Sequence, residues 1–163
     1  KIVVAMINGP AAGAGLALAL ACDVRIASTT AKLGATYAAV GLSGDYGITF
    51  TLSQIVGRPR AQSLLFSSRM LTAEAALHLG LVDEAVPPDD LAGATATLVR
   101  GFVEGPRVAY GLMKQALAAA DADQLRRILD IEAENLIRAI LTADHREAAK
   151  AFTEKRKPIF LGQ

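Results

Sequence analysis

A chain of 163 residues, 52% of them hydrophobic, can bury the core of one domain but is short for two. Its formal net charge of +1 argues against nucleic acid or an anionic membrane surface as the main partner. Cys22 is the only cysteine, which excludes a disulfide framework and a thiolate metal cluster and favours a cytoplasmic location. The longest apolar run, residues 11–22, is too short to cross ~30 Å of hydrocarbon.

The first third of the sequence alternates strand and helix patterns. Residues 2–7, "IVVAMI", predict a strand buried on both faces, and residues 11–21 predict a helix from their Ala and Leu content. A second strand is expected at residues 23–28 and a short extended segment at 31–37. Strand, helix and strand in so short a span indicate an α/β unit with a right-handed crossover. The chain opens on this strand pattern without a cationic leader, so we expect no signal peptide and a start inside a longer protein.

From Tyr46 the periodicity becomes helical. Gly57 is suited to a C-cap, Pro59 to a first helical turn and Thr72 to an N-cap. These signals predict helices over residues 46–57, 59–68 and 73–80, followed by a strand over 81–87. Beyond it, helices are expected at about 90–103, 106–120, 123–142 and 144–156. The sequence therefore divides into an α/β part, residues 1–88, and a helical part, residues 89–163.

The helical part carries apolar residues over a wide arc, which must be buried somewhere. They are Leu125, Ile128, Leu129, Leu136, Ile137, Ile140 and Leu141. Packing within the chain and an interface with another subunit both account for them.

A glycine-rich turn, "NGPAAGAGLALA", joins the first strand to the first helix. Unpaired N–H groups at a helix start favour a phosphate, a carboxylate or an oxyanion. Dinucleotide binding is disfavoured because the third glycine and a later acidic residue are absent, and a Walker loop lacks its Gly-Lys-Ser/Thr. The alternative is a tight turn in which Gly13 and Gly15 only let the helix pack on the strand.

The ordered motifs closely resemble the crotonase (enoyl-CoA hydratase/isomerase) superfamily. They are "KIVVAMINGPAAGAGLALALACDVRIAS", "AKLG", "VGLSGDYG", "IVGRPRAQSLLFSSRMLTAEAALHLGLVDEAVP" and "ADHREAAKAFTEKRKPIF". The resemblance implies an α/β fold: the C-terminal part, about 60%, of a crotonase-like ββα spiral, followed by a helical trimerisation region. Family members usually carry roughly a further hundred residues on the N-terminal side. Those residues supply much of the acyl-CoA pocket, so we expect this chain alone to be inactive.

The resemblance also implies a site. The backbone N–H of Ala14, between Gly13 and Gly15, would be one of two oxyanion-hole donors. The two glutamates of the family's hydratases fall on Ala17 and Tyr37, which disfavours ordinary hydration.

Asp45 lies where isomerase-type members carry a catalytic aspartate, and "GLSGDYG" resembles the loop of epoxyphenylacetyl-CoA isomerase-like members. A single carboxylate can remove a proton from one carbon and return it to another without adding water. Asp45 could instead be the N-cap of a helix beginning at Tyr46.

Other residues have two interpretations each. Tyr37 and Tyr46 are either hydroxyl donors to the substrate or residues that only pack in the fold. Lys155 either matches a family lysine that reaches the phosphates of CoA or lies in a solvated basic tail. His78 and His145 lack partners at metal-ligand or triad spacing, which favours structural or solvated roles.

We therefore expect an acyl-CoA isomerase or lyase that forms a trimer or a dimer of trimers. No metal or redox cofactor is expected, because CoA arrives as part of the substrate, and neither nucleic acid nor a membrane is an expected partner. An enoyl-CoA hydratase with substituted glutamates and a non-catalytic acyl-CoA-binding or assembly subunit are the alternatives.

Overall fold

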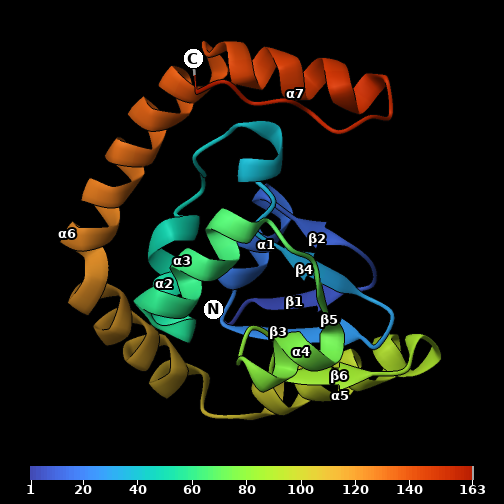
Figure 1. Ribbon diagram of the computed structural model, residues 1–163. Coiled ribbons are helices and arrows are strands. Elements are labelled where there is room, and N and C mark those ends of the chain that lie inside the picture. The colour runs from blue at the N-terminus through green and yellow to red at the C-terminus, as the bar shows by residue number, and fades with distance from the viewer. Residues whose placement is uncertain (163) are drawn as a thin grey trace.

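The computed structural model describes residues 1–162, and its centre is a parallel three-stranded sheet (Figure 1). Strand β3 (Val24–Ser28) lies between β1 (Val4–Ile7) and β6 (Glu84–Val86). The pairing of Val4 with Val24 sets the register on one side and that of Ile26 with Glu84 on the other. Helix α1 (Ala14–Leu20) connects β1 to β3, which confirms the predicted α/β unit.

A second, smaller sheet lies beside the first and begins in the glycine-rich turn. Strand β4 (Lys32–Gly34) pairs in parallel with β2 (Ala11–Ala12) and antiparallel with β5 (Leu71–Thr72). Gly34 is required at this point, because a Cβ there would lie 2.9 Å from the carbonyl oxygen of Arg69. The Gly13 N–H donates to the Gly34 carbonyl at 2.9 Å, which ties the turn to β4.

Three helices complete the α/β part and close its core. They are α2 (Ile48–Val56), α3 (Arg58–Ser67) and α4 (Ala73–His78), and Thr72 caps α4 as predicted, its Oγ1 accepting from the Ala75 N–H at 3.2 Å. The fully buried large side chains come from both sheets and helices: Leu16, Ile26, Leu33, Ile48, Leu52, Leu81 and Val82. Burial of this apolar surface is the main force that stabilises the fold.

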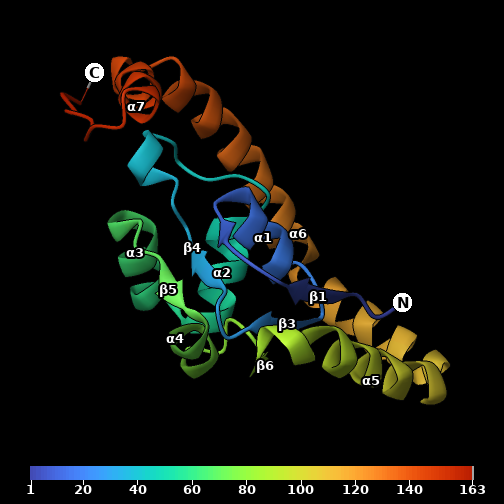
Figure 2. The ribbon, with the colours of Figure 1, turned by 90° about the vertical axis from the view of Figure 1, so that its right-hand side faces the viewer.

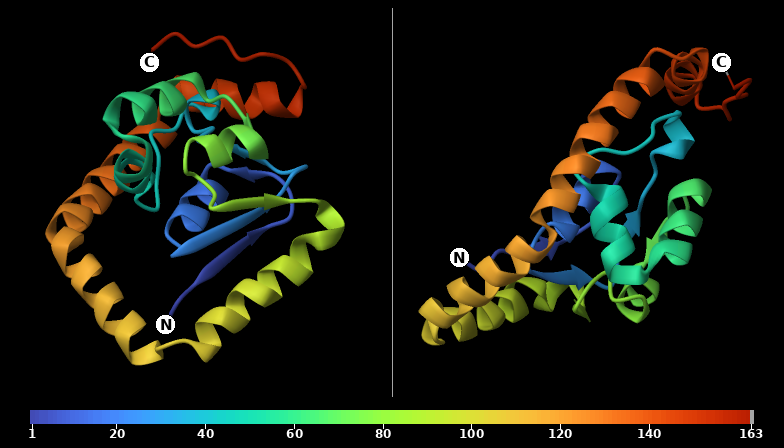
Figure 3. Two further views of the ribbon diagram at one scale, coloured as in Figure 1. Left: turned by 90° about the horizontal axis from the view of Figure 1, so that it is seen from below. Right: turned by 90° about the vertical axis from the view of Figure 1, so that its left-hand side faces the viewer.

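After β6 the chain is helical, and its helices surround the α/β part on three sides (Figures 1 and 3). A 3-10 turn, η2 (Pro88–Asp90), leads into α5 (Leu91–Glu104), which lies against β1 and β3 (Figure 2). Helices α6 (Arg107–Ile140) and α7 (Ala143–Thr153) follow. The division at residue 88 remains an interpretation.

Helix α6 corrects one prediction. The helices expected at 106–120 and 123–142 are a single helix of 34 residues. No glycine or proline interrupts "AAADADQL", and alanine there favours helix strongly enough to continue it through two aspartates. The break placed near residue 121 was therefore wrong.

Helix α6 does not bury all its apolar residues within the chain. Leu125, Ile128 and Leu136 are partly buried, whereas Ile137 and Leu141 remain 62% and 70% exposed. Packing within the chain thus accounts for only part of the apolar arc. Among the described residues, every helix is either too short or too polar to cross a membrane.

Candidate active site

The glycine-rich turn ends in a backbone conformation that favours glycine. Gly13 has a φ of 53° and precedes the first residue of α1, Ala14. The N–H groups of a helix's first turn have no acceptor inside the helix, so that of Ala14 is available to a negative group. Gly13 and Ala14 are partly exposed and Gly15 is exposed.

Tyr37 lies directly beside this turn. A Cβ built on Gly13 would be 3.8 Å from the Cζ atom of Tyr37 and 3.7 Å from Thr36 Oγ1. The Tyr37 side chain is buried, and its hydroxyl donates to Oδ1 of Asp45 at 2.5 Å. The structure therefore brings together the turn, Tyr37 and Asp45, which span more than 30 positions of the sequence.

The hydroxyl of Tyr37 is held as a donor. Burial raises its pKa well above the ordinary value of 10.0, and the hydrogen bond to Asp45 and the charges of Asp45 and Glu132 raise it further. The tyrosine stays protonated at physiological pH and donates its hydrogen bond to the Asp45 carboxylate. One of the two carboxylate oxygens is committed to this bond.

The Asp45 side chain is not a helix cap. Helix α2 begins at Ile48, and its N-cap is Gly47, which has no side chain that could cap the helix. Asp45 contributes only its backbone carbonyl, which accepts from the Ile48 N–H at 3.1 Å. The interpretation of Asp45 as the N-cap of a helix beginning at Tyr46 was wrong, because the loop continues for two more residues and the carboxylate bonds to Tyr37.

The loop around Asp45 has an unusual backbone. Gly44, Tyr46 and Gly47 have φ values of 112°, 52° and 74°. Tyr46 is a non-glycine residue in the left-handed region, which is costly for a residue with a Cβ. Its side chain is 59% exposed.

A buried glutamate that the sequence did not single out holds this loop from the other side. Oε2 of Glu132, on α6, accepts from the Gly47 N–H at 2.7 Å. Its Oε1 accepts from the Thr49 N–H at 2.9 Å and from the Thr49 hydroxyl at 2.5 Å. Helical periodicity gave no signal for this residue, because its partners lie more than 80 positions earlier in the chain.

Residues 1–163 match the sequence model of the family described as enoyl-CoA hydratase/isomerase. The chain belongs to this family. The resemblance to the crotonase superfamily is confirmed, as is the α/β fold with a helical C-terminal region.

Some relatives within the enoyl-CoA hydratase/isomerase family are named as isomerases and others as hydratases. The chain is 37% identical to 1,2-epoxyphenylacetyl-CoA isomerase from Escherichia coli K12, covering 100% of this chain and 62% of the relative. It is 35% identical to a short-chain-enoyl-CoA hydratase from Clostridium acetobutylicum, over 96% of this chain and 60% of the relative. An enoyl-CoA hydratase from Mycobacterium avium subsp. paratuberculosis superposes with a TM-score of 0.95 at 34% identity, over 99% of this chain and 65% of that structure. The chain thus spans about 60% of the length of these curated relatives.

The two positions where the resemblance implies hydratase glutamates lie close to the glycine turn. Ala17 is completely buried in α1, and Tyr37 is 5% exposed. Neither Ala17 nor Tyr37 has a carboxyl group that could act as an acid or a base. Asp45 is therefore the acidic side chain that the described contacts connect to this turn through Tyr37.

The remaining candidates lie apart from the Tyr37–Asp45 pair. Lys155 follows the end of α7 and is exposed, and the described hydrogen bonds do not connect it to the pair. His145 has a structural contact, as predicted: its Nδ1 lies 2.7 Å from the Val40 carbonyl oxygen and joins α7 to the 3-10 turn η1 (Ala38–Val40).

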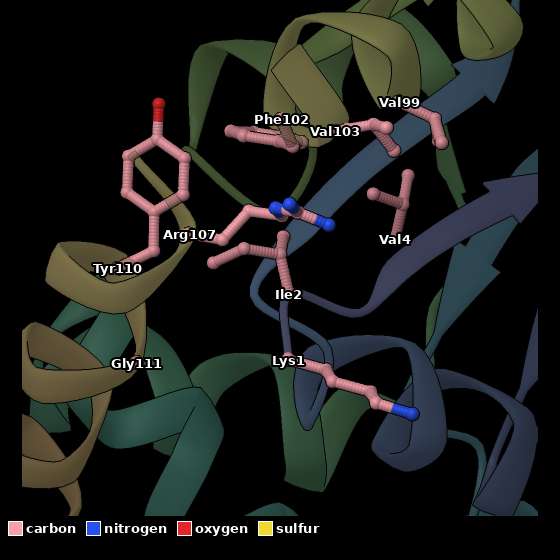
Figure 4. A pocket seen from close by; sticks show the side chains of 9 residues that line it. All are labelled: Lys1, Ile2, Val4, Val99, Phe102, Val103, Arg107, Tyr110 and Gly111. Atoms are coloured by element: carbon pink, nitrogen blue, oxygen red, sulfur yellow. The ribbon is translucent and has the colours of Figure 1, made fainter. Parts of the chain in front are cut away.

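A cavity of about 350 Å³ lies elsewhere, where α5 and α6 meet β1 (Figure 4). Val99, Phe102 and Val103 form one wall, the guanidinium of Arg107 reaches its centre, and the Lys1 ammonium points away. Its lining includes no residue of the glycine turn and neither Tyr37 nor Asp45, so this cavity is separate from the candidate acid–base site.

Proposed function

We propose that this chain carries the acid–base part of an acyl-CoA isomerase. Asp45 removes a proton from the carbon next to the thioester carbonyl, and the electron pair of that C–H bond forms an enolate on the thioester oxygen. The protonated carboxyl then returns the proton to another carbon, so the double bond moves and no water is consumed. The Ala14 N–H, with a second donor from the rest of the protein, stabilises the enolate oxygen.

The observation that carries this proposal is the Tyr37–Asp45 hydrogen bond beside Gly13. It orients one carboxylate next to the turn that holds the oxyanion donor, at a site where the hydratases' glutamate positions are Ala17 and Tyr37. A relative named 1,2-epoxyphenylacetyl-CoA isomerase is consistent with one-base chemistry.

The substrate class and the assembly are part of the same proposal. The substrate is an acyl-CoA thioester, and Gly13, Gly15 and Tyr46 line its path while Lys155 meets the CoA phosphates. The exposed apolar residues Ile137 and Leu141 support a homotrimer or a dimer of trimers. The lone Cys22 is consistent with a cytoplasmic location.

Hydration is the second candidate, favoured by relatives named as hydratases. To separate the two, the full-length protein is incubated in D2O with paired 2-enoyl-CoA and 3-enoyl-CoA substrates, and mass spectrometry follows the products. We expect deuterium incorporation with movement of the double bond, reduced about 100-fold or more in Asp45→Asn.

Water addition that survives Asp45→Asn would overturn the proposal and return the protein to hydratase chemistry with another base. Binding of acyl-CoA without turnover of either substrate would instead identify a non-catalytic acyl-CoA-binding or assembly subunit.

A further inference from the structure

A buried carboxylate on the long C-terminal helix contacts the loop of the candidate base but not the substrate-facing turn. Glu132 is 5% exposed, and both of its oxygens accept hydrogen bonds from Gly47 and Thr49. A buried carboxylate is stable only when its charge is compensated. Here the compensation comes from two backbone N–H groups and one hydroxyl at the start of α2, where the helix dipole also favours negative charge.

The loop that Glu132 holds would not keep its shape by local preference alone. Tyr46 occupies the left-handed region between two glycines with positive φ. Such backbone persists where the surroundings impose it. Helix α6 supplies that constraint by packing as well, since a Cβ on Gly47 would lie 3.2 Å from Leu125 Cδ1 and 3.5 Å from Leu129 Cδ2.

We infer that Glu132 is a positioning residue for Asp45. Its carboxylate fixes the backbone two residues after Asp45, while the Tyr37 hydroxyl fixes the Asp45 side chain. The base is thereby held at both its backbone and its side chain, and one of the two supports comes from the C-terminal helical region. This inference rests on the proposed role of Asp45 as the base.

The arrangement requires a carboxylate at residue 132. Three donors converge on two oxygens, and glutamine offers only one acceptor oxygen and turns an NH2 group toward the other donors. Alanine removes both acceptors. The graded loss from glutamine to alanine is therefore a signature of positioning by hydrogen bonds.

The test uses the full-length protein with Glu132→Gln, Glu132→Ala and a matched control, Glu134→Gln, which removes the same charge from an exposed position of α6. Rates are measured with the isomerase assay well below the thermal midpoint of each variant, together with amide exchange over residues 44–49. We expect kcat to fall about 10- to 100-fold, more in the alanine variant, because a small displacement of a base has effects of this size. We expect KM to change by no more than about threefold, exchange at Gly47 and Thr49 to accelerate, and the control to match wild type.

Unchanged kcat in the Glu132 variants with a lower thermal midpoint would overturn the inference, because a purely structural role reduces the amount of folded protein and not its turnover. If the alanine variant does not fold, Glu132→Gln and Thr49→Val, which removes one of the three donors, decide the question by the same kcat measurement. If Asp45→Asn retains wild-type activity, the proposed function fails and the positioning role with it. If Asp45→Asn is inactive while the Glu132 variants turn over normally, only the positioning role fails.

Discussion

At the scale of single residues, the central feature is the hydrogen bond from Tyr37 to Asp45, at a position where the resemblance to the hydratases implies a glutamate. Tyr37 does not replace the missing carboxylate as an acid, because burial and the neighbouring Asp45 hold its pKa above the ordinary range. Tyr37 keeps its proton and instead donates a hydrogen bond to Oδ1 of Asp45. A hydroxyl donor at this position supports a site with one base rather than two.

Tyr37→Phe tests this support by removing one oxygen atom. A hydrogen bond to a charged group contributes about 1.5–3 kcal/mol, so we expect kcat of the full-length protein to fall about 10- to 100-fold with little change in KM. Steady-state kinetics of double-bond isomerisation measure both. Tyr110→Phe removes the same atom far from the pair and serves as the control, and an unimpaired Tyr37→Phe enzyme would show that Asp45 needs no such donor.

At the scale of elements, α7 and the C-terminal tail are joined by carboxylates. Glu147 accepts from the Arg156 guanidinium at 2.5 and 2.9 Å and from the Ile159 N–H at 3.1 Å. The hydrogen bond from Arg156 is the main reason that the pKa of Glu147 falls from 4.5 to about 2. Asp144 accepts from the Leu161 and Gly162 N–H groups, so the tail folds back along the helix that precedes it.

The attachment of the C-terminal tail to α7 should weaken as the pH falls. Because the folded-state pKa of Glu147 is lowered, its contribution is fully present above about pH 4.5 and is lost as the pH falls toward 2. We expect protection of the Ile159 amide, corrected for intrinsic exchange rates, to decrease over that interval. In Glu147→Gln the protection should be low throughout, and a wild-type amide whose protection is constant from pH 5 to 2 would contradict this prediction.

At the scale of the whole molecule, α6 connects distant parts of the chain. Near its start, Lys114 Nζ contacts Asp23 Oδ2 at 2.5 Å and the Lys1 carbonyl at 3.1 Å. In its last third, Glu132 reaches the Asp45 loop, and further on Ile137 and Leu141 are exposed to solvent. Helix α6 thus contacts the residues that precede β1 and β3 as well as the candidate site, and its C-terminal end carries the exposed apolar surface that we propose for another subunit.

Replacing Ile137 and Leu141 together with glutamate tests the last of these roles. Burying two carboxylates in an apolar interface is unfavourable, so we expect the proposed trimer of the full-length protein to dissociate toward monomers in sedimentation velocity. Arg138→Glu changes charge on the same helix turn and serves as the control. A double variant with the wild-type sedimentation coefficient would place the subunit interface elsewhere.

Local sequence signals predicted the elements of the α/β part well. Apolar strand runs, Gly57 as a C-cap and Thr72 as an N-cap all depend on neighbours within a few residues, and the structure confirms these elements. The expectation that residues 2–7 are buried on both faces was wrong, because β1 covers only Val4–Ile7 and Met6 is 49% exposed. The same signals placed the start of the first helix at residue 11, although Ala11–Ala12 form β2, and they also misplaced two boundaries further along, one near residue 121 and one at Tyr46. In both cases the outcome depended on α6, which continues through Asp121 and packs against the loop after Asp45.

The sequence by itself determined the family, the glycine turn at Gly13 and the absence of glutamate at positions 17 and 37. These are properties of residue identity and order, and they need no knowledge of contacts. Only the tertiary structure decided that Tyr37 bonds to Asp45 and that Glu132 holds the loop beyond it. For Glu132 the physical reason is that its partners lie more than 80 residues away and are selected by how the helices pack, which leaves no periodic pattern near either partner. For Tyr37 and Asp45, the path of the intervening loop brings the two side chains together.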